Sequence, residues 1–253
     1  MSFIIIAMAN ALVGASIGIC GIAGFLLPIL YTEVLHYSVD QALAYSFLAF
    51  FISGALGSVS YHKNGNLDIT TSLKLGAGSL LGALGGVWLQ ALIAKNTAKE
   101  ILYLVVLISG ASILLRMYSD SKKKSTANLQ PAGNKNLVQN TAFLLFLGVS
   151  TGAICSLSGA GGPVLVMPLL VTFGISARLA VGIALFDSVF IAIPACIGYL
   201  ARVELLLPLL ALISISHSAG VICGSKIAHK VPVTALKLFV AVFSVCIALY
   251  MLL

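Results

Sequence analysis

Two apolar segments of the chain carry the same pattern of small residues. Gly14 to Leu30 reads GASIGICGIAGFLLPIL, and Gly148 to Leu170 reads GVSTGAICSLSGAGGPVLVMPLL. Both begin with G-x-S-x-G, pass through a cysteine and a glycine cluster, and end in Pro-aliphatic-Leu. Glycine-rich breaks at corresponding places in two hydrophobic halves are typical of the binding site of a membrane transporter. The pattern therefore predicts two related halves, each with one broken membrane segment.

The composition sets the class of protein. Apolar residues make up 60% of the 253 residues and charged residues only 8%, whereas a soluble domain carries roughly 25% charged residues. The apolar runs are continuous, so they fit helices crossing a ~30 Å hydrocarbon core and not the alternating strands of a barrel. We expect an all-α, multi-pass protein of the bacterial inner membrane. Its net charge of +7 is attributed to Lys and Arg in the loops, which orient membrane helices, and not to nucleic-acid binding.

The apolar runs predict the same organisation in both halves. The first half, 1–118, is expected to hold a broken segment at 3–35 and helices at 40–61, 72–94 and 99–117. A basic linker follows at 119–136. The second half, 137–253, is expected to hold a broken segment at 137–175 and helices at 178–199, 205–227 and 233–253. Such repetition indicates a tandem duplication.

Lys and Arg positions help to choose between parallel and inverted halves. If each broken segment crosses the membrane once, the halves are parallel and the basic residues divide eight to six. If each is a hairpin that enters and leaves on one side, the halves are inverted and the division is eleven to three, with only Lys95, Lys99 and Arg202 on the poorer side. Because cytoplasmic loops are enriched in Lys and Arg, the inverted arrangement is favoured. It places the linker in the cytoplasm and both termini outside; parallel halves remain the alternative.

The glycine clusters are the candidate substrate site. A helix that restarts after a break presents unpaired N–H groups and about half a positive charge, so two restarts facing each other near mid-membrane would bind an anion. Nearby hydroxyls could add donors. The alternative is that the glycines only allow close helix packing. The candidate substrate-binding residues are Ser16, Gly18, Gly21, Gly24, Ser150, Ser156, Ser158, Gly159, Gly161, Gly162 and Pro163.

Asp187 is the acidic residue at the centre of a predicted membrane helix. An ionisable group there is costly and suggests a function such as proton coupling, with His217 of the next helix as its candidate partner. A structural role for either residue is the alternative. Catalysis is not expected, because G-x-S-x-G in an apolar helix lacks the strand–turn–helix context of a hydrolase. The five cysteines lack metal-site spacing, and neither a metal nor another cofactor is expected.

The chain resembles the TauE/SafE family of sulfite exporters and organosulfonate permeases over essentially its whole length. The most specific match is SGAGGPVLVMPLL, Ser158 to Leu170, and Gly198-Tyr199 followed by Arg202-Val203 is also similar. The first copy, GICGIAGFLLPIL, has fewer glycines than the family pattern. The resemblance implies a secondary transporter whose cargo is a small sulfur oxyanion or organosulfonate, such as sulfite, thiosulfate or a sulfoacetate-like anion.

Two other functions stay open. Cys20 and Cys155 lie near the breaks, as in a membrane thiol–disulfide electron carrier, although neither is flanked by proline. An anion channel would also fit the same segments. The expected partners are the lipid bilayer and a small anion, and the sequence leaves open whether the protein forms a homo-oligomer.

Overall fold

The computed structural model describes residues 2–21, 23–93, 140–204 and 206–228, with residue 138 and scattered positions in 97–118 and 234–249. Every regular element in this part is helical, which confirms the all-α membrane fold. The linker 119–136 and most of the helix expected at 233–253 lie outside it, whereas the described positions within the helix expected at 99–117 are all helical. The elements are α1 (Ser2–Cys20), η1 (Ala23–Phe25), α2 (Leu26–Ile29), η2 (Leu30–Val34), α3 (Val39–Lys63), α4 (Ile69–Leu92), α7 (Thr141–Ser158), α8 (Gly162–Thr172), α9 (Ala177–Leu200) and α10 (Leu207–Ile227).

Polar residues in the loops fix where several helices begin. Ser38 and Gln41 form a capping box at the start of α3, and the side chain of Asn140 accepts hydrogen bonds from the first turn of α7. Asp68 does the same for the N–H groups of Thr70 and Thr71. Such caps satisfy backbone donors that have no partner within the helix. The Asp68 cap explains why α4 begins at residue 69, three residues before the predicted start at 72.

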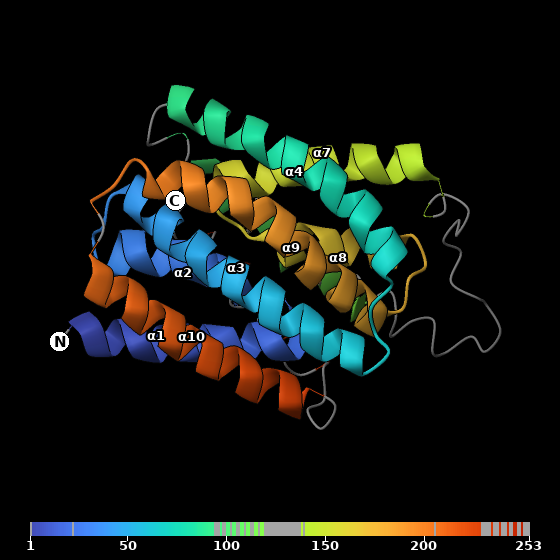
Figure 1. Ribbon diagram of the computed structural model, residues 1–253, viewed down its shortest axis with the longest axis horizontal. Coiled ribbons are helices and arrows are strands. Elements are labelled where there is room, and N and C mark those ends of the chain that lie inside the picture. Colours follow the sequence, from blue (N-terminus) through green and yellow to red (C-terminus); the bar gives the residue numbers. More distant parts are fainter. Residues whose placement is uncertain are drawn as a thin grey trace.

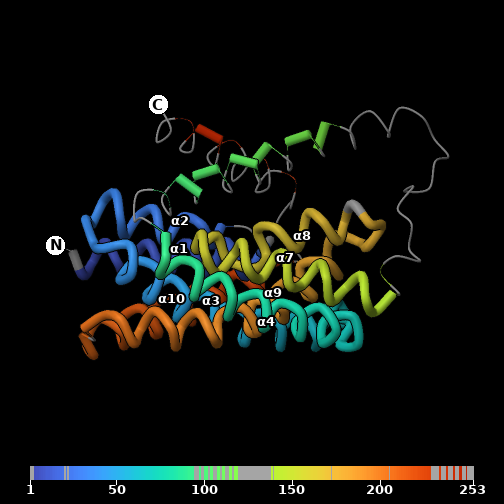
Figure 2. Tube along the Cα trace, turned by 90° about the horizontal axis from the view of Figure 1, so that it is seen from above, coloured from blue at the N-terminus to red at the C-terminus, as the bar shows by residue number. Residues whose placement is uncertain are grey.

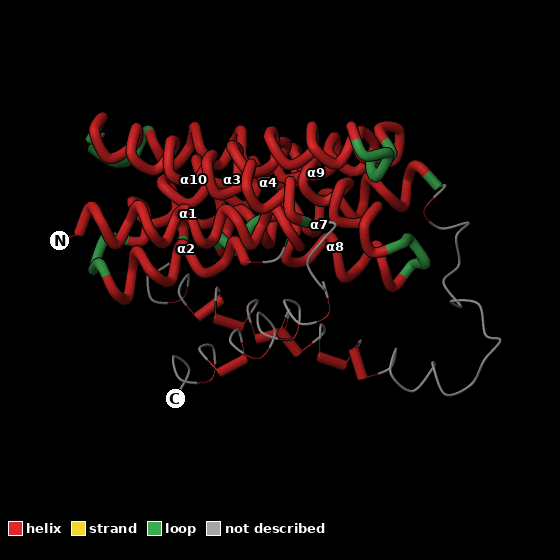
Figure 3. The backbone as a smooth tube through the Cα atoms, turned by 90° about the horizontal axis from the view of Figure 1, so that it is seen from below, coloured by secondary structure: helices red, strands yellow, loops and turns green. Residues whose placement is uncertain are grey.

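The described helices form two layers. Helices α4, α9, α3 and α10 make one layer, and the two broken segments, α1 with α2 and α7 with α8, make the other (Figures 2 and 3). Each arm of a broken segment covers one helix of the first layer: α1 packs on α10, α2 on α3, α8 on α9 and α7 on α4. The two halves are therefore interleaved, because α1 of the first half packs on α10 of the second, and α7 of the second packs on α4 of the first (Figure 1).

Glycines bring the backbones of these helix pairs into close contact. At the α4–α7 crossing the contacting positions rise together along both helices, which are therefore parallel: Gly78 with Leu145, Gly82 with Val149, Gly86 with Ala153. The α1–α10 crossing is also parallel: Gly14 with His217, Gly18 with Val221. Close approach at small residues in i, i+4 steps is the packing mode of membrane helices.

The direction of each helix is opposite to that of its counterpart in the other half. Gly54 of α3 contacts Leu185 of α9, whereas Asn66, just after α3, contacts Gly182, so α3 and α9 are antiparallel. Short connections at 64–68 and 201–206 reverse the chain before α4 and α10. Combined with the two parallel crossings, these directions make α1 antiparallel to α7 and α4 antiparallel to α10 (Figure 1).

Basic residues gather at one end of this bundle. The end of α3 lies beside the end of α1, because the Tyr61 hydroxyl donates to the carbonyl oxygen of Ile19 at 3.1 Å. The Asn66–Gly182 contact brings the start of α9 to the same end. This end therefore carries Lys63 and Arg178. Lys226, next to the Ser225 that approaches Gly18, lies there as well.

Arg202 lies at the opposite end. Its guanidinium donates to the carbonyl oxygen of Val87 at 3.1 Å and to Oε1 of Gln90 at 2.8 Å, near the end of α4. The separation of Arg202 from Lys63, Arg178 and Lys226 is the one that the hairpin arrangement requires.

Five of the described helices are long and apolar enough to cross a membrane: α3, α4, α7, α9 and α10. The apolar stretches at 23–34 and 162–171 are shorter than the ~20 residues that a full crossing needs. They return towards the end from which the preceding α1 or α7 started (Figure 1). The chain is a multi-pass integral membrane protein.

Candidate functional site

Both broken segments turn at a glycine with positive φ. Helix α1 ends where the N–H of Gly21, at φ +76°, donates to the carbonyl oxygen of Ile17. Helix α7 ends where the N–H of Gly159, at φ +77°, donates to the carbonyl oxygen of Cys155. Gly161 has φ +78° and ψ 146°, a combination that is nearly restricted to glycine. The glycine clusters are therefore needed for the backbone turns themselves.

The two breaks lie against each other. A Cβ atom built at Gly21 would be 3.5 Å from Cβ of Pro163, and one built at Gly159 would be 3.3 Å from Cγ of Pro28. The ring of Phe50, on α3, contacts both Gly24 and Gly161, since Cβ atoms there would be 2.9 Å from its Cε1 and 3.3 Å from its Cε2. The structure thus brings the glycine clusters of both halves together, near the middle of α3.

The return arms of the two halves differ. In the second half, α8 is one helix of 11 residues with Pro163 in its first turn, where the missing N–H of proline costs nothing. In the first half, a short 3-10 turn, a four-residue α-helix and a π turn follow one another. Both arms contain an internal proline, Pro28 and Pro168, so the missing proline donor does not by itself explain why the first arm is irregular. Each broken segment thus consists of two shorter helical arms that meet at the glycine cluster, and the return arm of the first half, 23–34, is the less regular one.

Some of the candidate hydroxyls lie at the breaks and others do not. Ser158 accepts a hydrogen bond from the N–H of Ala160 at 3.3 Å, and Ser156 is fully buried two residues earlier. Ser16 and Ser150 instead donate to carbonyl oxygens one turn back in α1 and α7. Gly18 packs against the backbone of α10. Ser16, Ser150 and Gly18 thus lie outside the cluster, because the glycines of the G-x-S-x-G strings pack on neighbouring helices and the serines bond within their own helix.

Asp187 is fully buried in α9. The hydroxyl of Ser79, on α4, and the thiol of Cys155, on α7, are its neighbours. Neither carboxyl oxygen has hydrogen-bond geometry to any residue that the structure describes. The next residue, Ser188, touches the second break, since its Oγ would be 2.9 Å from a Cβ at Gly162. An ionisable group so placed beside a helix break suggests a role in transport.

His217 belongs to a different polar cluster. Its Nδ1 is 3.1 Å from the carbonyl oxygen of Asn10, and its Nε2 has no partner within the described part of the chain. The side chain of Asn10 donates to the carbonyl oxygen of Ile6 and to the Tyr31 hydroxyl at 2.8 Å. The structure therefore does not pair His217 with Asp187. Sequence reasoning missed Asn10, although a lone amide within the apolar run of α1 was a signal.

The described part of the chain offers little support for a thiol–disulfide site or a metal site. Sγ of Cys155 lies 3.3 Å from the carbonyl oxygen of Gly161, so this thiol contacts the second break, and the side chain of Cys20 lies outside the described residues. No group of three or more His, Cys, Asp or Glu side chains that could hold a metal occurs among the described residues.

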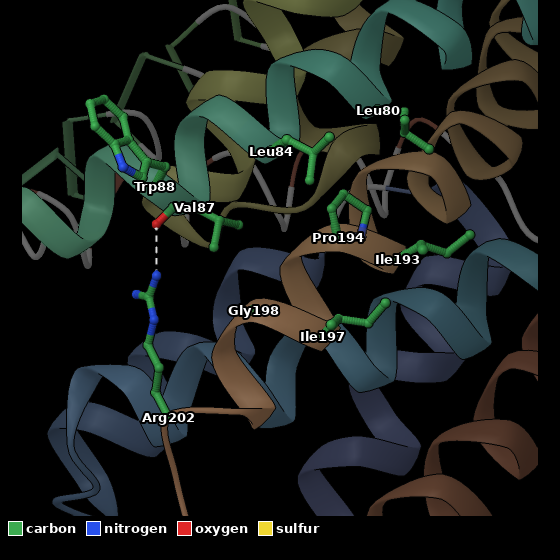
Figure 4. Close-up of a pocket in the computed structure, with 9 residues that line it drawn as sticks. All are labelled: Leu80, Leu84, Val87, Trp88, Ile193, Pro194, Ile197, Gly198 and Arg202. Carbon is green, nitrogen blue, oxygen red and sulfur yellow. Dashed lines mark hydrogen bonds between the residues drawn. The ribbon is translucent and has the colours of Figure 1, made fainter.

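A groove of about 450 Å³ runs between α4 and α9. Figure 4 shows apolar side chains along it and Arg202 at one end, with its guanidinium pointing to Val87. Trp88 and Ile197 on its walls are about two-thirds exposed. None of the glycines of the two breaks lines this groove, so it is separate from the candidate substrate site.

Comparison with known proteins identifies the family. The family model described as "Sulfite exporter TauE/SafE" matches residues 3–251. The chain belongs to the TauE/SafE family. This confirms the resemblance carried by the second glycine cluster.

Relatives of this TauE/SafE protein are named as membrane transporters. "Probable membrane transporter protein YdhB" of Bacillus subtilis (strain 168) is 22% identical over 236 residues, covering 92% of this chain and 93% of that protein. "Probable membrane transporter protein YtnM" of the same organism is 28% identical over 170 residues, covering 66% of this chain and 54% of that protein. No solved structure matches the chain. A role in membrane transport follows from the family.

Proposed function

We propose that this TauE/SafE protein is a secondary transporter of small anions, with sulfur oxyanions or organosulfonates as its cargo. The observation that carries the proposal is the meeting of the two glycine breaks around Phe50. Binding is proposed at Gly21, Gly24, Gly159, Gly161 and Gly162, where the lack of a side chain lets an anion approach the backbone closely. The N–H groups of Gly21 and Gly159 already donate within their own helices, so the proposed donors are those at the start of α8.

The charge pattern supports recognition by backbone groups. The sequence contains no Lys or Arg in residues 1–62 or 137–177, which include both broken segments. An anion at the breaks would therefore meet backbone N–H groups and hydroxyls such as that of Ser158, not a basic side chain. Helix α8 starts at Gly162, so the positive end of its dipole is directed at the break. Backbone N–H groups and hydroxyls bind oxyanions and carboxylates alike. The sulfur oxyanion or organosulfonate cargo is therefore proposed from the description of the family.

A binding screen tests the function. Purified protein is heated in detergent with sulfite, thiosulfate, sulfate, sulfoacetate, taurine or acetate, and the unfolding temperature is recorded. A ligand that binds only the folded state raises that temperature with concentration. Stabilisation by sulfonates or sulfite, and not by chloride at equal ionic strength, is the expected result. No stabilisation by any of these anions would reject the proposal.

We also propose that the two halves are inverted repeats, with the 119–136 linker in the cytoplasm. The opposite directions of corresponding helices and the gathering of Lys63, Arg178 and Lys226 at one end support it. Labelling of intact cells with an impermeant thiol reagent, on a cysteine-free background, is expected to modify a cysteine added at the C-terminus. A Ser125→Cys change in the linker should stay unlabelled. The reverse result would overturn this topology.

Asp187 is proposed to carry the coupling proton. His217 is proposed to take part in coupling from the separate polar cluster that it forms with Asn10. Asp187→Asn should keep substrate binding but lose the response of flux to a proton gradient, because the amide keeps the shape of the carboxyl without its titratable proton. Flux into proteoliposomes with and without an imposed gradient measures this. Asp68→Asn is the matched control, since Asn also caps helices well. An unaltered gradient response in Asp187→Asn would remove this residue from the mechanism.

A further inference from the structure

The ring of Phe50 lies against both breaks. Its Cε1 and Cζ atoms face Gly24, and its Cε2 and Cζ atoms face Gly161. Only 2% of its surface is exposed. Gly24 and Gly161, one from each glycine cluster, thus contact the same aromatic ring.

An aromatic stack holds this ring in place. Phe47 packs edge-on against Phe50, with ring centroids 5.5 Å apart at 87°. Phe47 also stacks on Tyr199, with centroids 5.6 Å apart at 14°. The hydroxyl of Tyr199 donates to the carbonyl oxygen of Ser156 at 2.7 Å, just before the second break. The position of the Phe50 ring is therefore linked to the end of α7.

The ring is an apolar wall beside both breaks. A Cβ atom built at Gly161 would lie 3.3, 3.4 and 3.5 Å from Cε2, Cζ and Cδ2, and therefore over the face of the ring. That face carries partial negative charge, so the ring would act on an anion by shape and not by electrostatic attraction. The organic part of an anion bound to the backbone at the breaks would meet this rigid wall. A glycine on either side leaves no other side chain between the ring and the backbone.

We propose that Phe50 is the residue that determines which anions the site accepts, because its ring is the wall that limits the organic part of the cargo. The inference rests on the proposed function and deepens it: the favoured substrate class is small sulfonates without a bulky substituent. Apolar fit of this kind discriminates by about 10–200-fold for each methylene group.

The test compares the binding of methanesulfonate and benzenesulfonate to the purified protein. In wild type, methanesulfonate is expected to bind and benzenesulfonate to be excluded. Phe50→Ala should raise the ratio of benzenesulfonate to methanesulfonate association constants by at least about tenfold. Phe50→Leu retains much of the apolar volume, should shift the ratio in the same direction, and keeps the test decisive if the alanine variant does not fold. Phe51→Ala is the matched control, because this neighbouring ring is 38% exposed on α3.

The outcomes separate the two proposals. A wild type that binds neither sulfonate overturns both the proposed function and the role of Phe50. If wild type binds methanesulfonate and Gly161→Val does not, the proposed site stands. In that case, an unchanged binding ratio in both Phe50 variants overturns the role of Phe50 alone. A shift of equal size in Phe51→Ala would also overturn it, since a general loosening of α3 would then explain the effect.

Discussion

Replacing Gly161 by valine is expected to abolish anion binding and transport while the protein still folds into the membrane. Gly161 has φ +78°, and a β-branched residue there costs on the order of 3 kcal/mol, equivalent to about a 100-fold loss in affinity if the break distorts to relieve it. The new side chain would also meet the Phe50 ring, 3.3 Å from the Cβ position. Uptake kinetics and the binding screen measure the loss.

Gly65→Val separates the site from the general cost of a strained backbone. Gly65 has φ +70° in the loop between α3 and α4, and nothing lies within 4 Å of a Cβ atom built there. The control therefore introduces a similar strain where no anion is proposed to bind. Normal transport is expected in Gly65→Val. Normal transport in Gly161→Val would reject the proposed site, and equal losses in both variants would attribute the effect to strain.

The second large effect concerns the crossing of α4 with α7. Gly82→Val is expected to destabilise the protein by about 3 kcal/mol or more, lowering its unfolding temperature by on the order of 10 °C. A Cβ atom at Gly82 would overlap the carbonyl oxygen of Val149. Because that oxygen belongs to the helix backbone, a change of side-chain rotamer cannot relieve the overlap, and the two helices must separate.

Gly85→Val is the matched control on the same helix. Gly85 lies three residues further on, and nothing is within 4 Å of a Cβ atom built there. This variant is expected to unfold at the wild-type temperature or slightly above it, since valine has a better helix propensity than glycine. Thermal unfolding of both purified variants in the same detergent gives the comparison. A Gly82→Val protein as stable as Gly85→Val would contradict the close crossing.

The sequence alone determined the features that depend on local pattern. Apolar run length predicted the membrane helices, because a span needs about 20 residues wherever it lies. The repeated glycine clusters predicted where both segments break, since a sharp turn of the backbone requires glycine locally. The stretch from Ser158 to Leu170 also indicated the family before any comparison. Whether these breaks bind an anion stays a prediction.

Only the tertiary structure decided which residues meet. The sequence did not predict that Phe50 would contact both Gly24 and Gly161, or that Asn10 would contact His217. Asp187 and His217 were suggested as partners from their places on successive helices, yet their neighbours come from α4, α7 and α1. A hydrophobic pattern shows that a helix is buried in lipid or protein but not which helix covers it. The interleaving of the halves, α1 on α10 and α7 on α4, sets these contacts, because it joins residues that lie far apart in the chain.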